Sequence, residues 1–155
     1  MKNALLMLAA FLLMEPVAAI AHRFVFHGFA YKLHKADHEP GQGVFRKIDY
    51  FPVISALITA VAVSLGVWLE PLDFLIPAGF GMGAYGLAYW FIHDIAIHGR
   101  ARAFKVNLSW FKFHYDAHMF HHRFNGPPYG LVFPYVSKRM SRYLSKENGS
   151  SSENE

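Results

Sequence analysis

The sequence predicts an all-α integral membrane protein with about three membrane spans and a helical cap that carries histidines at the cytoplasmic face. Three observations lead to this prediction. The chain of 155 residues is 54% hydrophobic and only 17% charged, whereas a soluble domain carries roughly 25% charged residues. Two uncharged stretches each reach the ~20 residues that a helix needs to cross a bilayer. The 10 histidines all lie at the ends of the apolar stretches or in the polar segments that connect and follow them.

The first apolar stretch, 4–21, is interrupted by Glu15 and Pro16. Because Lys2 precedes it and small residues end it, a cleaved signal peptide is the alternative to a span. The helical pattern that begins at His22 continues directly from this stretch, which favours a span. An acid inside a span commonly faces the protein interior and has a function. The alternative for Glu15 is a residue near the membrane interface that finds a polar partner.

The second and third stretches, 50–69 and 74–92, are bounded by acidic residues and contain no charge. Neither alternates with period 2 and both are too long for ordinary strands, so both are predicted to be helices. Gly79, Gly83 and Gly86 in the third stretch indicate close helix packing. A groove for a substrate along these glycines is the alternative interpretation.

Three spans place the segments 22–49 and 93–155 on the same side of the membrane. Lys2 is the sole basic residue outside these two segments, among 15 lysines and arginines. The positive-inside rule therefore predicts that both segments, and with them the histidines and the C-terminus, are cytoplasmic. Topology and anionic lipid account for the basic charge, so no nucleic-acid partner is predicted. We expect one membrane domain, 1–144, followed by a disordered polar tail, 145–155.

The histidines form four groups with helical spacing. The groups are His22 and His27; His34 and His38; His93 and His98; and His114, His118, His121 and His122. Residues three or four apart share a face of an α-helix, so His34/His38, His118/His121 and His118/His122 are each predicted to bind one ion. Residues five apart lie about 140° apart around an α-helix. The pairs His22/His27 and His93/His98 are therefore expected to reach towards two different ions.

Single histidines at a membrane interface are commonly no more than polar tips, and a histidine-rich loop can be a loose metal-buffering tract. Four groups embedded among aromatic and aliphatic residues favour a built metal site instead. The chain has no cysteine, which excludes thiolate sites, and clustered imidazoles suit zinc, iron, copper or nickel. Because a zinc ion takes four ligands, eight or more histidines indicate two ions. Two redox metals beside apolar helices suggest oxygen activation on a lipid-soluble substrate.

The four histidine groups, in this order and spacing, resemble the β-carotene hydroxylase family, a branch of the membrane fatty-acid hydroxylase superfamily of non-haem di-iron enzymes. The resemblance covers about 15–137 and includes Asp49 and the run from Pro128 to Leu131. His93-Asp94, with His98, and the Gly28 that follows His27 are similar to the carotenoid branch in particular.

The resemblance implies a membrane monooxygenase that uses O2 and two irons to hydroxylate carbon 3 of β-ionone rings, giving β-cryptoxanthin and then zeaxanthin. The metal ligands that it implies are His22, His27, His34, His38, His93, His98, His118, His121 and His122. Asp94 would orient a neighbouring imidazole, with a helix-end surface charge as the alternative. No haem, flavin or ferredoxin module fits in the chain, so a separate electron donor is expected, such as ferredoxin with its reductase.

The sequence departs from the family pattern at one position of the second histidine group. The family has His-x-x-His-His there, whereas this chain has Asp37 in place of the first of the paired histidines. His114, one turn before His118, is an additional histidine. We expect Asp37 to lie near a metal, as a ligand or as an acceptor behind one, and His114 as its replacement is the alternative.

Other functions also fit a histidine-rich membrane protein. One is a di-iron hydroxylase or desaturase that acts on a fatty acyl chain or a sterol. The other is a non-enzymatic membrane metal carrier, although Glu15 is the sole acid inside a predicted span.

Overall fold

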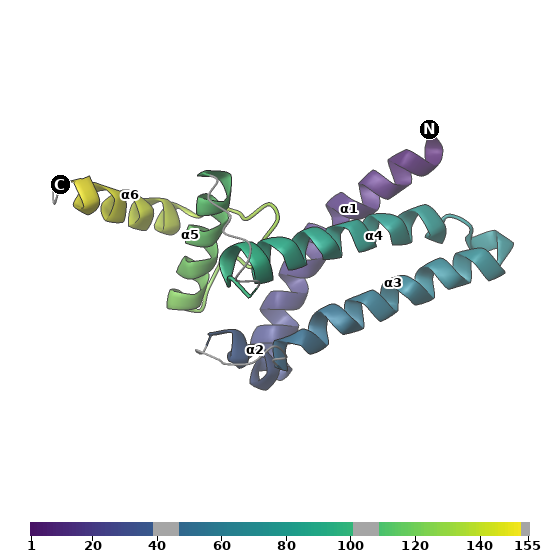
Figure 1. Ribbon diagram of the computed structural model, residues 1–155, viewed down its shortest axis with the longest axis horizontal. Coiled ribbons are helices and arrows are strands. Elements are labelled where there is room, and N and C mark those ends of the chain that lie inside the picture. Colours follow the sequence, from purple (N-terminus) through teal and green to yellow (C-terminus); the bar gives the residue numbers. More distant parts are fainter. Residues whose placement is uncertain (39–46, 101–108, 153–155) are drawn as a thin grey trace.

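The computed structural model describes residues 1–38, 47–100 and 109–152, and every regular element among them is helical (Figure 1). In chain order these elements are α1 (Lys2–Ala21), the π-helix η1 (His22–Phe29), α2 (Tyr31–His38), the 3-10 turn η2 (Lys47–Asp49), α3 (Tyr50–Trp68), the 3-10 turn η3 (Glu70–Leu72), α4 (Leu75–Trp90), the π-helix η4 (Phe91–Ile97), α5 (Ser109–Phe124) and α6 (Lys138–Ser152).

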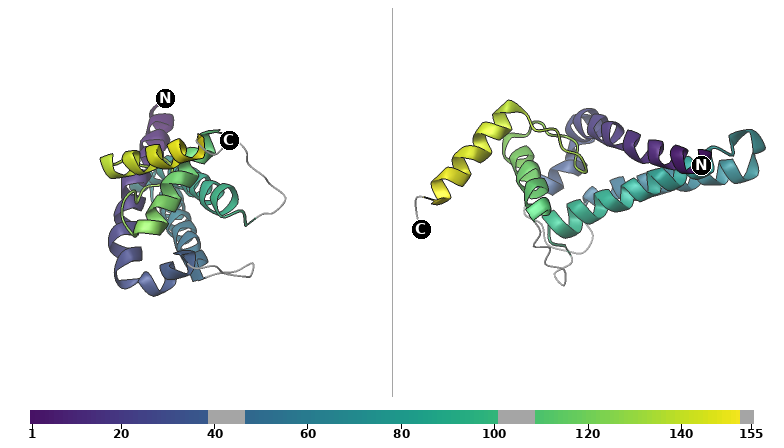
Figure 2. Two further views of the ribbon diagram at one scale, coloured as in Figure 1. Left: turned by 90° about the vertical axis from the view of Figure 1, so that its left-hand side faces the viewer. Right: turned by 90° about the horizontal axis from the view of Figure 1, so that it is seen from above.

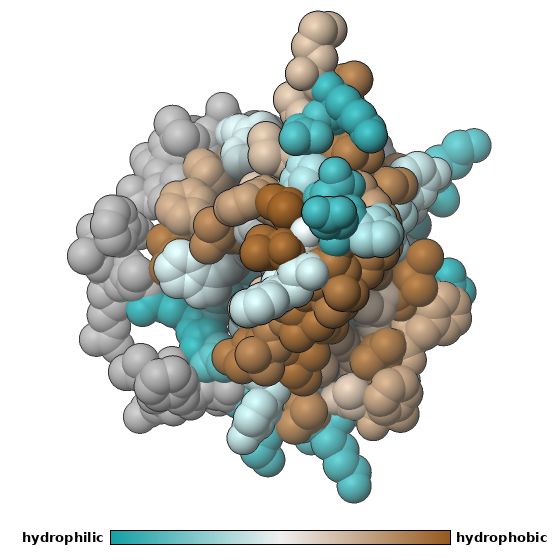
Figure 3. All heavy atoms as spheres, turned by 90° about the vertical axis from the view of Figure 1, so that its right-hand side faces the viewer, coloured by the Kyte–Doolittle hydropathy of each residue, from teal (hydrophilic) through white to brown (hydrophobic). Residues whose placement is uncertain are grey.

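Three helical runs are long and apolar enough to cross a membrane, as the sequence predicts. They are Lys2–Phe29, Lys47–Trp68 and Leu75–Ile97. Pro16 lies inside α1 without ending it, which helices in a membrane tolerate. Large apolar side chains remain exposed along these runs. Figure 3, which views the molecule from the end where α3 turns into α4, shows apolar residues over much of the surface. The protein is therefore an integral membrane protein.

Helix α4 lies between α1 and α3 and packs against both (Figure 1). Two glycines permit this close approach. A Cβ atom at Gly79 would collide with the side chain of Val63 on α3, and one at Gly81 would collide with the backbone oxygen of Met7 on α1. The prediction of close helix packing at the α4 glycines is thus confirmed for Gly79. Gly86 has no atom within 4 Å of such a Cβ.

The shorter helices α2, α5 and α6 gather at one end of the three long runs (Figures 1 and 2). Ala117 and Phe120 of α5 pack with Met140 of α6 in a small apolar cluster. The segment between α5 and α6 returns to the spans, where Leu131 and Val132 join a second cluster with Tyr85, Ile92 and Ile97. This segment therefore connects the cap to the membrane helices.

Helix α6 continues to Ser152, beyond residue 144, where the sequence predicts that a disordered polar tail begins. The helix thus includes the first eight residues of that segment, and residues 153–155 lie outside the described part of the chain. The division of the chain at residue 144 stays a prediction.

Candidate metal centre

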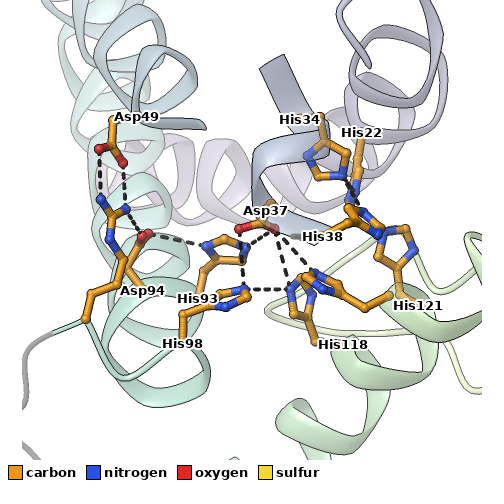
Figure 4. A network of polar contacts seen from close by, with 12 residues as sticks. His22, His34, Asp37, His38, Asp49, His93, Asp94, His98, His118 and His121 are labelled. Carbon is orange, nitrogen blue, oxygen red and sulfur yellow. Dashed lines mark hydrogen bonds and ion pairs between the residues drawn. The ribbon is translucent and has the colours of Figure 1, made fainter. Parts of the chain in front are cut away.

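All nine histidines that the resemblance implies as ligands come together at the cap end of the spans. Figure 4 shows most of them. Seven of the nine, together with Asp37, form two groups. The first comprises His22, His27, His34 and His121, and the second comprises Asp37, His93, His98 and His118; within each, one ligand atom per residue lies within 4.8 Å of the others. Each group has a geometry that could hold a metal ion.

The first group consists entirely of imidazoles. His34 Nε2 lies 3.0 Å from His22 Nε2 and 3.1 Å from His38 Nε2. On the opposite side of the group, His27 Nε2 lies 3.1 Å from His121 Nε2. A hydrogen atom on a ring nitrogen can join only one pair of nitrogens. A proton on His34 Nε2 therefore cannot form hydrogen bonds to both His22 and His38. A cation among these nitrogens would satisfy all of them.

The second group is arranged around the carboxylate of Asp37, a residue that is only 4% exposed. One oxygen, Oδ2, lies 3.0 Å from His93 Nε2 and 3.4 Å from His122 Nε2. The other, Oδ1, lies 3.4 Å from His98 Nε2. Asp37 Oδ1 and His122 Nε2 are both buried without a hydrogen-bond partner among the described residues. A metal ion bound among these buried side chains would be a partner for both atoms.

His38 and His122 lie where the two groups meet. Their rings stack, with centroids 4.2 Å apart and planes 11° apart. His38 contacts the first group through His34, and His122 contacts the second through Asp37. Each group therefore has a fifth candidate donor.

The expectation that residues five apart reach towards different ions is wrong. His22 and His27 both belong to the first group, and His93 and His98 both belong to the second. The reason is that His22 and His27 lie on the π-helix η1, and His93 lies on the π-helix η4, directly after which comes His98. The backbone N–H of His98 donates to His93 O at 2.9 Å, and this five-residue hydrogen bond brings the two side chains onto one face.

Helix α5 supplies both groups. His118 belongs to the second group and His121 to the first, so the prediction that these two bind one ion is also wrong. In an α-helix His121 points about 60° to one side of His118 and His122 points about 40° to the other. The rings of His118 and His122 accordingly lie side by side, with centroids 4.2 Å apart. The predicted pairings of His34 with His38 and of His118 with His122 are consistent with the observed contacts.

Three histidines are oriented by acceptors behind them. His22 Nδ1 donates to the carbonyl oxygen of Tyr129 at 2.9 Å, and His121 Nδ1 donates to that of Gly126 at 2.6 Å. His93 Nδ1 lies 3.3 Å from Asp94 Oδ2, the position that the sequence predicts for this carboxylate. A proton fixed on Nδ1 leaves the lone pair of Nε2 directed into the group, which is the usual arrangement of a metal-bound histidine.

Arg100 holds Asp94 in place from behind. Its guanidinium contacts Asp94 and also donates to both oxygens of Asp49, at 2.6 and 2.8 Å. The hydrogen bonds to Asp49 raise the pKa of Arg100, and Asp94 raises it further. The sequence does not indicate this role of Arg100, because its partners lie 6 and 51 residues away along the chain. The carbonyl groups of Gly126 and Tyr129 were missed because every residue has a carbonyl.

His114 lies apart from both groups. It is 2% exposed, and its Nδ1 and Nε2 lie 2.9 Å and 3.0 Å from the carbonyl oxygens of Trp110 and Val132. With both ring nitrogens against backbone oxygens, His114 has no nitrogen directed at either group. The geometry thus favours Asp37 over His114 as the tenth donor.

Burial keeps four of the imidazoles outside the spans neutral. It lowers the pKa of His34 to about 2, that of His121 to about 3, and those of His38 and His98 to about 4. These histidines are therefore neutral at pH 7, as metal binding requires. For Asp37 burial acts in the raising direction, but His93 and His122 outweigh it and lower the pKa. Asp37 is thus a carboxylate.

Comparison with known proteins gives relatives along most of the chain. No protein-family model matches, and no solved structure matches. The chain is 30% identical to the β-carotene hydroxylase of Pantoea ananas, covering 95% of this chain and 86% of that protein. It is 32% identical to the β-carotene hydroxylase of Pseudescherichia vulneris, covering 88% and 77%. A chloroplastic β-carotene 3-hydroxylase of Gentiana lutea is 33% identical over 76% of this chain and 38% of its own length. The chain therefore belongs to the β-carotene hydroxylase family.

Proposed function

We propose that this protein is a membrane-bound oxidoreductase that hydroxylates carbon 3 of β-ionone rings, converting β-carotene to β-cryptoxanthin and then to zeaxanthin. One observation carries the proposal: a chain of the β-carotene hydroxylase family has two groups of side chains that could each hold a metal ion. Relatives in bacteria and plants are named β-carotene hydroxylase or 3-hydroxylase. The two groups in this chain contain seven of the nine histidines that the family resemblance implies, and His38 and His122 lie beside them.

The donor set fits two iron ions. Each group offers four ligand atoms within 4.8 Å of one another, with His38 and His122 as additional donors. The first group would hold its ion with His22, His27, His34, His38 and His121, and the second with Asp37, His93, His98, His118 and His122. Neutral imidazoles with one or no carboxylate, and no thiolate, are ligands that iron accepts.

Bound iron would supply the reduction of O2 and the transfer of one oxygen atom into a ring C–H bond. The reaction is balanced by two electrons and two protons, which convert the second oxygen atom to water. We expect the electrons to come from a separate donor such as ferredoxin with its reductase. The part of this chain's own residues is to hold the ions in fixed positions and to keep the imidazoles neutral and correctly oriented.

The position of the groups suits a substrate dissolved in the bilayer. Both groups lie where the three spans meet the cap (Figures 1 and 4). His22 follows directly after α1, and His93 lies within the third apolar run. A carotenoid ring can thus approach from the apolar region without leaving the membrane. We propose that this end of the spans faces the cytoplasm.

Co-expression in a bacterium that accumulates β-carotene tests this function. Pigments extracted from the cells and separated by chromatography are expected to include β-cryptoxanthin and zeaxanthin. A matched strain that expresses His118→Ala is expected to retain β-carotene. Unchanged β-carotene in the first strain, with the protein present in the membrane and loaded with iron, would contradict the proposal.

A further inference from the structure

A carboxyl group inside the first span contacts neither metal group. Glu15 lies on α1, where its Oε2 accepts a hydrogen bond from the hydroxyl of Tyr85 on α4 at 2.8 Å. The same oxygen accepts a second bond from the backbone N–H of Val132 at 3.2 Å. A carboxyl group in an apolar environment is costly unless it is hydrogen-bonded, so residues of this kind usually have a specific role.

The backbone of Val132 is hydrogen-bonded on both sides, by the partly buried Glu15 and the buried His114. Its N–H donates to Glu15, and its carbonyl oxygen accepts from His114 Nε2 at 3.0 Å. Two residues before Val132, the backbone at Gly130 also lies close to Glu15. A Cβ atom at Gly130 would collide with Oε1 of Glu15. Three helices, α1, α4 and α5, therefore hold this part of the chain at one place.

The same segment supplies two of the acceptors that orient metal-group histidines. Gly126 O accepts from His121 Nδ1, and Tyr129 O accepts from His22 Nδ1. Both histidines belong to the first group. In the second group, His93 is oriented by Asp94 instead. A displacement of residues 126–132 would thus disturb the first group and spare His93.

We propose that Glu15 is a positioning residue, which anchors residues 126–132 so that the carbonyl groups of Gly126 and Tyr129 orient His121 and His22. This inference rests on the metal sites of the proposed function. The role requires an acceptor for two hydrogen bonds and no transfer of a proton. An amide oxygen can accept the same two bonds, so glutamine is expected to replace Glu15, whereas alanine is not.

The test compares the full-length chain with Glu15→Ala, Glu15→Gln and Met14→Ala. Met14 packs against the apolar cluster that contains Tyr85, Leu131 and Val132. Its truncation therefore removes packing contacts of the same region without removing the hydrogen bonds of Glu15. Each protein is purified in detergent and loaded anaerobically with 57Fe(II). Iron is counted by mass spectrometry, and the two sites are distinguished by Mössbauer spectroscopy.

Glu15→Ala is expected to reduce bound iron about twofold, with loss or broadening of one of the two iron signals. Glu15→Gln and Met14→Ala are expected to retain both signals. Tyr85→Phe, which removes one donor to Glu15 and keeps the ring, is expected to fall between the parent and Glu15→Ala. It provides the test should Glu15→Ala fail to insert.

Two results would overturn the role of Glu15 while leaving the proposed function intact. One is a parental iron content and spectrum in both Glu15→Ala and Tyr85→Phe. The other is an equal loss in Glu15→Gln and Glu15→Ala, which would indicate that the carboxyl group itself is required. A parent chain that binds no iron would instead contradict the metal sites and this inference together.

Discussion

Asp37, which stands where the family resemblance implies a histidine, lies at the centre of the second group. Both of its oxygens face imidazole nitrogens, at 3.0 Å from His93 and 3.4 Å from His98. An aspartate side chain is shorter than that of histidine. It nevertheless reaches the group, because α2 brings its last turn directly over the histidines of η4 and α5 (Figure 4).

Replacement of Asp37 is therefore predicted to affect one of the two ions. Asp37→Ala removes the single carboxylate of the second group and is expected to lower hydroxylation at least tenfold, with loss of iron. Asp37→His restores a donor of the family type and is expected to keep most activity. Pigment conversion and iron content, measured on the same membranes, check both variants.

His114→Ala serves as the control for Asp37, since His114 is also buried and both of its ring nitrogens face backbone oxygens. Its effect on the second group, to which Asp37 belongs, is expected to be mild. Loss of an iron in His114→Ala with no effect of Asp37→Ala would reverse the assignment.

Single ligand replacements in either group are predicted to be equally damaging. His38→Ala, His98→Ala and His121→Ala each remove one imidazole from a site whose chemistry depends on fixed geometry. Each variant is expected to insert into the membrane and to give no hydroxylated pigment above background. Membrane fractionation with pigment analysis measures both properties. Full activity in any of the three would remove that histidine from the ligand set.

At the level of elements, two π-helical segments determine which histidines act together. The sequence predicts the spans and the histidine groups, because apolar length and residue type are visible in it. It does not show that η1 and η4 depart from α-helical geometry, so the partners of His27 and His98 could not be predicted. The segment 126–132 was likewise beyond prediction, since it acts on His22 and His121 through backbone carbonyls.

Helix α4 is held between its neighbours through its glycines. Gly81→Leu places a side chain against the backbone of α1 at Met7. We expect a loss of roughly 1–3 kcal/mol of stability, the usual cost of overpacking. Gly86→Leu is the matched control, because a Cβ there has open space. Thermal unfolding in detergent compares the two, and equal midpoints would contradict the packing of α1 on α4.

At the level of the whole molecule, three spans place the cap on one side of the membrane. Fourteen of the 15 lysines and arginines lie in the segments 22–49 and 93–155, and the positive-inside rule predicts that these segments are cytoplasmic. Reporter fusions at Ser145 and at Glu70 are therefore expected to report opposite compartments, with Ser145 in the cytoplasm. The same compartment for both would contradict the three-span topology.

The central claim is that the cap and the spans together hold two separate iron ions. The most direct measurement is the iron content of the purified full-length chain after anaerobic loading with Fe(II) and removal of unbound metal. Two groups with five candidate donors each predict about two irons per chain. Binding of stoichiometric zinc with no iron, or of a single iron that survives replacement of either His27 or His98 by alanine, would contradict it.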